Sequence, residues 1–79
     1  MRLDKYLKVS RLIKRRTVAN EACENGKVLL NGKAAKPAAD VKEGDILELL
    51  FGERTIKVEV LKIAEHTLKQ DASDLYRTL

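Results

Sequence analysis

The sequence has few of the residues on which catalysis and metal binding depend. Its 79 residues include one cysteine, Cys23, and one histidine, His66, so they cannot supply the four ligands of a structural zinc site. A lone histidine among polar residues is usually solvated, and a lone cysteine among small apolar residues usually packs in the core. We therefore predict that neither residue is catalytic.

Phosphate-binding loops and calcium loops are missing as well. The four glycines are isolated from one another, so they form no glycine-rich phosphate loop. The acidic stretch 40–45 lacks the alternating oxygen ligands and the closing glutamate of an EF-hand. The sequence thus predicts a protein that is not an enzyme and that needs no metal and no cofactor.

Disulfides and long apolar runs are also lacking. Cys23 alone cannot form the internal disulfide on which small secreted domains usually depend. No apolar run approaches the roughly 20 residues that cross a bilayer, and charges interrupt the N-terminal stretch every two or three positions. We therefore expect a cytoplasmic protein without a signal peptide. A chain this short forms one domain and buries only about 60% of its unfolded surface.

The positive charge is concentrated in the first sixteen residues. Residues 2–16 hold seven lysines and arginines and one acidic residue, Asp4, which gives +6, whereas residues 17–79 hold nine basic and eleven acidic residues, which gives −2. A clustered basic surface attracts polyanions. The sequence therefore predicts binding to nucleic acid, with an affinity that falls steeply as salt rises.

Residues 2–13 are predicted to form a first helix with an apolar face and a basic face. The segment has no glycine or proline, and steps of about 100° per residue sort its side chains. The apolar side holds Leu3, Tyr6, Leu7 and Ile13. The basic side holds Lys5, Lys8, Arg11 and Arg15, with Leu12 interrupting it. Tyr6 has the chemistry to stack on a base, but its spacing favours a core position.

A second helix is predicted from Thr17, whose hydroxyl suits an N-cap, to about Glu24, with Gly26 as a left-handed cap after it. Its small apolar positions suit close packing against the first helix: Val18, Ala22 and Cys23. The turn between the two helices would then present three cations, Lys14, Arg15 and Arg16.

Strand patterns follow Gly26. Residues 28–30 lead into Asn31-Gly32, a dipeptide that favours a type I′ hairpin turn. Residues 46–51 form an apolar run typical of a central strand, residues 52–54 read as a turn, and residues 56–60 alternate as in a half-buried strand. Beyond Ile63 the pattern weakens, and three residues of the tail are candidates to dock on the domain: Leu75, Tyr76 and Leu79.

Several short motifs together resemble those of a known family. They are Arg2-Leu3-Asp4-Lys5-Tyr6-Leu7, Ser10-Arg11, Arg15-Arg16-Thr17, Gly26-Lys27-Val28, Asn31-Gly32, Val41 and Gly44-Asp45. Over roughly residues 1–50 this combination resembles the S4 RNA-binding domain. Nearly the whole chain is similar to the RqcP family, the short stand-alone S4 proteins of bacterial ribosome-associated quality control, and residues 9–17 carry most of that likeness.

The resemblance implies an α+β fold of the S4 type (αL-like), with two packed N-terminal helices on a small antiparallel sheet and a short C-terminal tail. Residues 1–63 would form the RNA-binding domain, and residues 64–79 a tail able to form a short docked helix. It also implies a monomer that binds the large ribosomal subunit obstructed by peptidyl-tRNA. The partners would be 23S rRNA, the peptidyl-tRNA and RqcH, the factor that adds alanine tails.

The resemblance also implies which residues contact RNA. Those expected to do so directly are Arg2, Lys5, Arg11, Arg15 and Arg16, with Lys8 and Lys14 as supporting charge. Asp4 has two interpretations. Either it caps the first helix and orients a neighbouring arginine, which we favour, or it contacts RNA directly through a base amino group or a ribose hydroxyl.

Three alternatives stay open. Heat shock proteins of the S4 type are also expected on large subunits, but they generally carry a longer basic C-terminal extension than the near-neutral tail seen here. S4 domains are also appended to pseudouridine synthases and tyrosyl-tRNA synthetases, but we expect no catalytic domain to follow this one. A DNA-binding helix-turn-helix is disfavoured because the cations gather on the first helix and turn rather than on a recognition helix.

Overall fold

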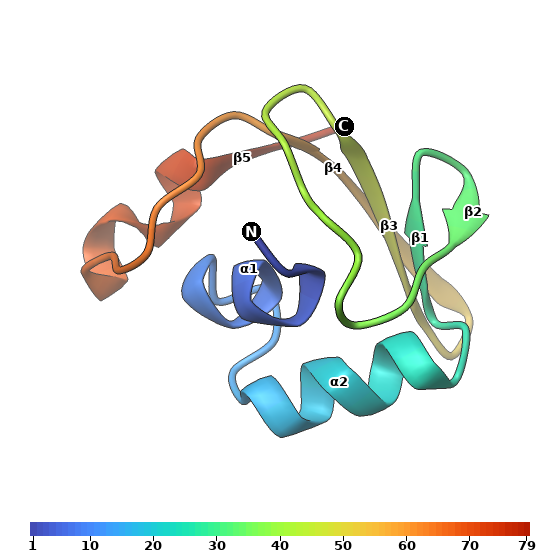
Figure 1. Ribbon diagram of the computed structural model, residues 1–79. Coiled ribbons are helices and arrows are strands. Elements are labelled where there is room, and N and C mark those ends of the chain that lie inside the picture. Colours follow the sequence, from blue (N-terminus) through green and yellow to red (C-terminus); the bar gives the residue numbers. More distant parts are fainter.

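Two short helices cover one face of a five-stranded antiparallel sheet in the computed structural model, which describes all 79 residues (Figure 1). The elements in chain order are α1 (Leu3–Val9), α2 (Arg16–Glu24), β1 (Val28–Leu30), β2 (Lys33–Ala34), β3 (Ile46–Phe51), β4 (Arg54–Val60), the 3-10 helix η1 (Lys69–Leu75) and β5 (Tyr76–Thr78). The strands lie in the order β2-β1-β3-β4-β5. The predicted fold class is confirmed.

The first helix ends four residues earlier than predicted. Ser10 caps α1, and Arg11 turns into the left-handed region at φ 62°. The Arg11 amide donates to the Lys8 carbonyl at 3.1 Å, and the Ile13 amide donates to the Leu7 carbonyl at 3.1 Å. This turn brings Ile13 back to the core. The sequence pattern missed it because glycine, not arginine, usually occupies the left-handed position after a helix.

The second helix begins two residues earlier than the predicted cap implied. Arg15 is the N-cap and makes no side-chain capping bond, so Thr17 lies inside α2 rather than before it. As a result the buried positions are Ala19 and Cys23, whereas Val18 is 48% exposed and does not pack as predicted. The left-handed Gly26 after α2 is confirmed at φ 70°.

The sheet follows its predicted pattern closely. Asn31 and Gly32 both have positive φ, at 51° and 88°, as a type I′ turn between β1 and β2 requires. β3 spans the predicted residues, and β4 begins at Arg54, which was expected in the turn. The sheet residues buried against the helices are Val28, Leu47, Leu49, Val58 and Val60.

The tail adds an edge strand that the sequence did not predict. β5 pairs with β4 in the register Val60 to Tyr76. The Leu75 carbonyl before it accepts hydrogen bonds from the Tyr6 hydroxyl at 2.8 Å and from the Leu61 amide at 2.8 Å. Leu75 is buried, and Tyr76 packs against the core. Leu79 is 54% exposed, so it does not dock as expected. The division of the chain at residue 63 stays a prediction.

The core gathers the apolar face of α1 and the inner face of the sheet. Leu3, Tyr6 and Leu7 are fully buried, which confirms the core position predicted for Tyr6. None of the helices has the length and apolar character needed to cross a membrane.

Candidate nucleic-acid interface

The predicted RNA-binding residues are divided by α1 rather than gathered on one face. On one side lies the Asp4 groove, an open depression lined by Arg2, Asp4, Arg16, Thr17, Asn20 and Glu21. On another side lies the α1–tail hollow, lined by Lys5, Lys8, Val9, Arg11, Glu65, His66 and Thr67. The prediction that Arg15 shares a helix face with Lys5 and Lys8 is wrong, because α1 ends at Val9 and Arg15 is the N-cap of α2. The early end of α1 accounts for this, because Arg15 does not continue the helix.

Asp4 lies at the centre of the Asp4 groove. Its carboxylate accepts two bonds from the Arg2 guanidinium, at 3.1 and 3.2 Å, one from Arg16 at 3.4 Å and one from the Asn20 amide at 3.3 Å. The Asp4 side chain is 3% exposed, whereas those of Arg2 and Arg16 are 50% and 48% exposed. One buried anion thus holds two half-exposed cations at the junction of α1 and α2.

The Asp4 carboxylate stays ionised in this position. Burial by itself would raise its pKa, but the bonds from Arg2 and Asn20 and the charges of Arg16 and Arg2 outweigh burial and hold the pKa below its ordinary value. A direct bond to RNA would need an exposed carboxylate, and this one faces the arginines. The favoured interpretation, that Asp4 orients arginine, agrees with the geometry. The capping interpretation does not, because α1 has no side-chain cap.

The α1–tail hollow joins segments about sixty residues apart. The Lys5 ammonium group in α1 donates a hydrogen bond to the Glu65 carboxylate in the tail. Lys8 and Arg11 are exposed and line the same hollow. Sequence reasoning missed Glu65 and Thr67 and dismissed His66, because nothing in a local pattern shows that the tail returns to α1.

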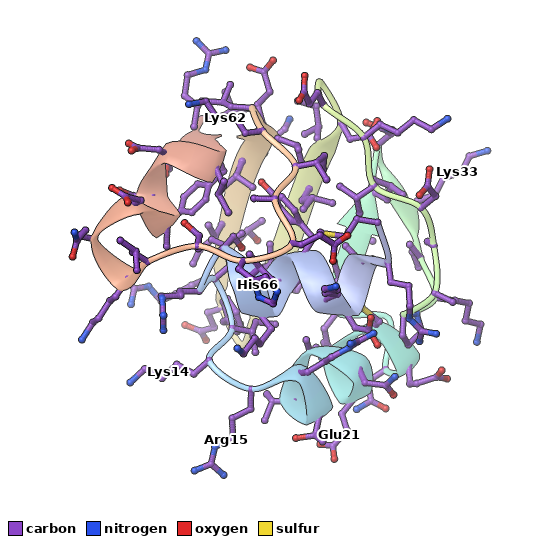
Figure 2. All side chains as sticks on the ribbon, turned by 60° about the vertical axis from the view of Figure 1, so that its left-hand side comes forward. Lys14, Arg15, Glu21, Lys33, Lys62 and His66 are labelled. Atoms are coloured by element: carbon purple, nitrogen blue, oxygen red, sulfur yellow. The ribbon has the colours of Figure 1, made fainter.

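The turn between the helices presents the remaining cations. Lys14 and Arg15 are exposed, and Figure 2 shows both side chains pointing away from the body of the protein. Arg16, expected in the turn, is the first residue of α2 and reaches back to Asp4. Asn20 was also missed, although it lies one helical turn after Arg16, where side chains share a face.

Arg11→Gly is expected to leave the free energy of unfolding unchanged or to raise it by up to about 1 kcal/mol. A left-handed backbone costs a residue with a side chain about 1–2 kcal/mol, and glycine removes this cost. Glycine also gives the unfolded chain more conformational freedom, which cancels about 0.4–1 kcal/mol of that stabilisation. Urea unfolding measures the effect. The control Lys8→Gly removes the same charge inside α1 and should lose about 1 kcal/mol. An equal loss in both variants would contradict the expectation.

Comparison with known proteins assigns the family. A model described as the S4 domain matches residues 1–47, and the chain belongs to the S4 domain family. It is 54% identical to a protein of Halalkalibacterium halodurans over 96% of the chain and 86% of the relative, and 48% identical to one of Bacillus subtilis over 100% and 92%. Both relatives are named RQC P-site tRNA stabilizing factor. Within the S4 proteins, the chain belongs to this family.

A solved structure supports the fold. The trimeric Heat Shock Protein 15 of Vibrio cholerae superposes with a TM-score of 0.93 at 35% identity, over 100% of this chain and 81% of that one. The same fold therefore serves both groups of S4 proteins. In sequence the chain is more similar to the two RQC factors, at 54% and 48% identity, than to this heat shock protein, at 35%.

Proposed function

We propose that this protein is a non-catalytic RNA-binding factor of bacterial ribosome-associated quality control, acting in the cytoplasm. It binds the large ribosomal subunit obstructed by peptidyl-tRNA, contacts 23S rRNA and the P-site tRNA, and supports alanine tailing by RqcH. The name of the two relatives supports the tRNA-stabilising role. The observation that carries the proposal is the pair of arginines that Asp4 holds at the protein surface.

The mechanism we propose is electrostatic positioning of RNA. A guanidinium offers a rigid fork of donors that matches a phosphate with two parallel bonds. Because Asp4 already restrains Arg2 and Arg16, less side-chain freedom is lost when RNA binds. The other cations extend the contact on either side of this pair: Lys5, Lys8, Arg11, Lys14 and Arg15. No bond is made or broken in this role.

A tagged full chain recovered from bacterial cells and separated on a sucrose gradient tests the proposal. We expect it with free large subunits that carry peptidyl-tRNA, together with RqcH. Recovery on such subunits without RqcH would favour the second candidate, a heat-shock S4 factor, which the fold likeness supports. Migration as free protein or with DNA would contradict both.

Arg16→Ala is expected to weaken binding to large subunits about tenfold, because a hydrogen bond from a charged group contributes about 1.5–3 kcal/mol and 1.4 kcal/mol is tenfold. The slope of log affinity against log salt should also fall by about 0.9 for the lost phosphate contact. Arg54→Ala removes the same charge from an exposed position at the start of β4. Equal binding by the Arg16 and Arg54 variants would place the interface elsewhere.

A further inference from the structure

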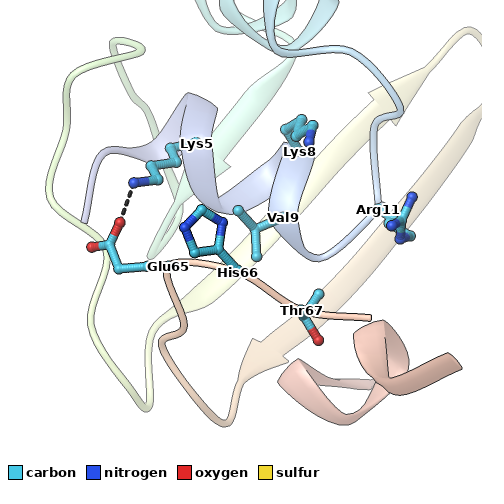
Figure 3. Close-up of a pocket in the computed structure, with 7 residues that line it drawn as sticks. All are labelled: Lys5, Lys8, Val9, Arg11, Glu65, His66 and Thr67. Carbon is cyan, nitrogen blue, oxygen red and sulfur yellow. Dashed lines mark hydrogen bonds and ion pairs between the residues drawn. The ribbon is translucent and has the colours of Figure 1, made fainter. Parts of the chain in front are cut away.

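The segment between β4 and η1 forms one wall of the α1–tail hollow (Figure 3). α1 and the turn after it contribute Lys5, Lys8 and Arg11, and the segment contributes Glu65, His66 and Thr67. Val9 is the only apolar residue in the lining. The hollow has a volume of about 190 Å³, far more than a single water needs. Such a polar, cationic recess suits a hydrated anion.

The charges in the hollow are unbalanced. Three cations face one carboxylate, that of Glu65, which pairs with Lys5 alone. The proximity of Lys5 holds the pKa of Glu65 below its ordinary value, so the pair is ionised. Lys8 and Arg11 line the hollow without a carboxylate partner. The Glu65 side chain is 69% exposed, and an ion pair so exposed contributes little to stability. A stronger anion can therefore take its place.

His66 adds a donor to the same recess. Figure 3 shows its ring beside Val9, on the side of Lys5 and Glu65, with Arg11 farther away beyond Val9. An imidazole carries at least one N–H whatever its protonation state. The ring is exposed to solvent and bonded to no other side chain in the structure, so its N–H is free to reach a ligand in the hollow.

We propose that the α1–tail hollow is a second phosphate-binding site for the RNA backbone, in which a phosphate displaces Glu65 from Lys5 and receives a hydrogen bond from His66. The inference rests on the proposed function, since the RNA is the same one that the Asp4 groove holds. It adds the tail segment to the interface. Phosphates bound on both sides of α1 would fix the angle of the helix against the RNA, which one site alone cannot do.

Three variants of the full chain, assayed for binding to purified large ribosomal subunits at fixed pH and salt, test the proposal. Glu65→Gln removes the competing carboxylate and should bind about two- to fivefold more tightly. His66→Ala loses a donor and should bind about fivefold more weakly. Glu53→Gln makes the same charge change at the exposed β3–β4 turn and should match the parent within about twofold. If Glu65→Gln bound no more tightly than Glu53→Gln, or if His66→Ala bound like the parent, the proposal would be overturned.

A titration with inorganic phosphate separates this inference from the proposed function. In the parent chain, phosphate should shift the NMR resonances of the His66 ring and of the Glu65 side chain, and Lys8→Gln should weaken both shifts. If the parent fails to bind subunits but shows these shifts, the proposed function is wrong and the phosphate site stands. Resonances at His66 and Glu65 that do not move would refute the site even if subunits bind.

Discussion

Asp4→Asn is expected to lower the free energy of unfolding by about 2 kcal/mol and to weaken subunit binding by about tenfold. The carboxylate accepts bonds from two guanidiniums and one amide, and bonds to charged groups contribute about 1.5–3 kcal/mol each in favourable geometry. The half-exposed arginines reduce this figure through solvent screening. An asparagine keeps one acceptor oxygen but has an NH2 donor in place of the other, and it carries no negative charge, so the restraint on both arginines is weakened.

The direction of the binding change decides what Asp4 does. If the carboxylate only repelled RNA, its removal would tighten binding, whereas a positioning residue weakens binding when it is lost. Asp74→Asn is the matched control, because it removes an equal charge from an exposed position in η1. Tighter binding by both variants would show that net charge alone sets the affinity.

The pH dependence of unfolding provides a second test of Asp4. Its pKa lies below the ordinary value of 3.8 in the folded protein, so the folded state binds this proton less readily than the unfolded state. The stabilisation is therefore complete above about pH 5 and is lost as the pH falls through 3.8 and then through the lowered pKa. Urea unfolding of the parent should show this loss. In the Asp4→Asn variant the corresponding part of the slope should be missing.

Tyr6→Ala is expected to cost about 3–5 kcal/mol, the range for removing a buried aromatic side chain. A chain of 79 residues has roughly 4–12 kcal/mol of stability at about 0.05–0.15 kcal/mol per residue. At the lower end of this range the loss would leave a substantial fraction of the protein unfolded at room temperature. Urea unfolding followed by circular dichroism measures it.

Tyr6→Phe isolates the hydrogen bond from the packing. The hydroxyl is buried and donates to the Leu75 carbonyl at 2.8 Å, and burial together with the nearby Tyr76 raises the pKa of Tyr6. We expect a loss of about 1 kcal/mol, with faster hydrogen exchange at the amides of Leu61 and Lys62, which share that carbonyl. Exchange unchanged at these two amides would show that the tail is held by other contacts.

Local pattern predicted the sheet better than the helix ends. The strand β4 and the Asn31-Gly32 turn depend on neighbouring residues, and both are observed. The predicted alternation of burial along β4 holds only from Val58 to Val60, because Ile56 is 37% exposed. The end of α1 depends on Arg11 adopting a left-handed backbone, which the turn to the buried Ile13 stabilises. Because that stabilisation comes from the core, a helical wheel could not find it.

The sequence by itself determined the charge polarity, the α+β fold and the S4 family, because these depend on composition, on neighbouring residues and on a motif spacing confined to residues 1–47. Only the tertiary structure decided how the cations are used. Packing of α1 against α2 buries Asp4 beneath Arg2 and Arg16, and the returning tail sets Glu65 against Lys5. The Arg16–Asp4 and Lys5–Glu65 contacts join residues that are distant in sequence. They form because the fold brings these segments together, which the pattern of charges along the sequence does not predict.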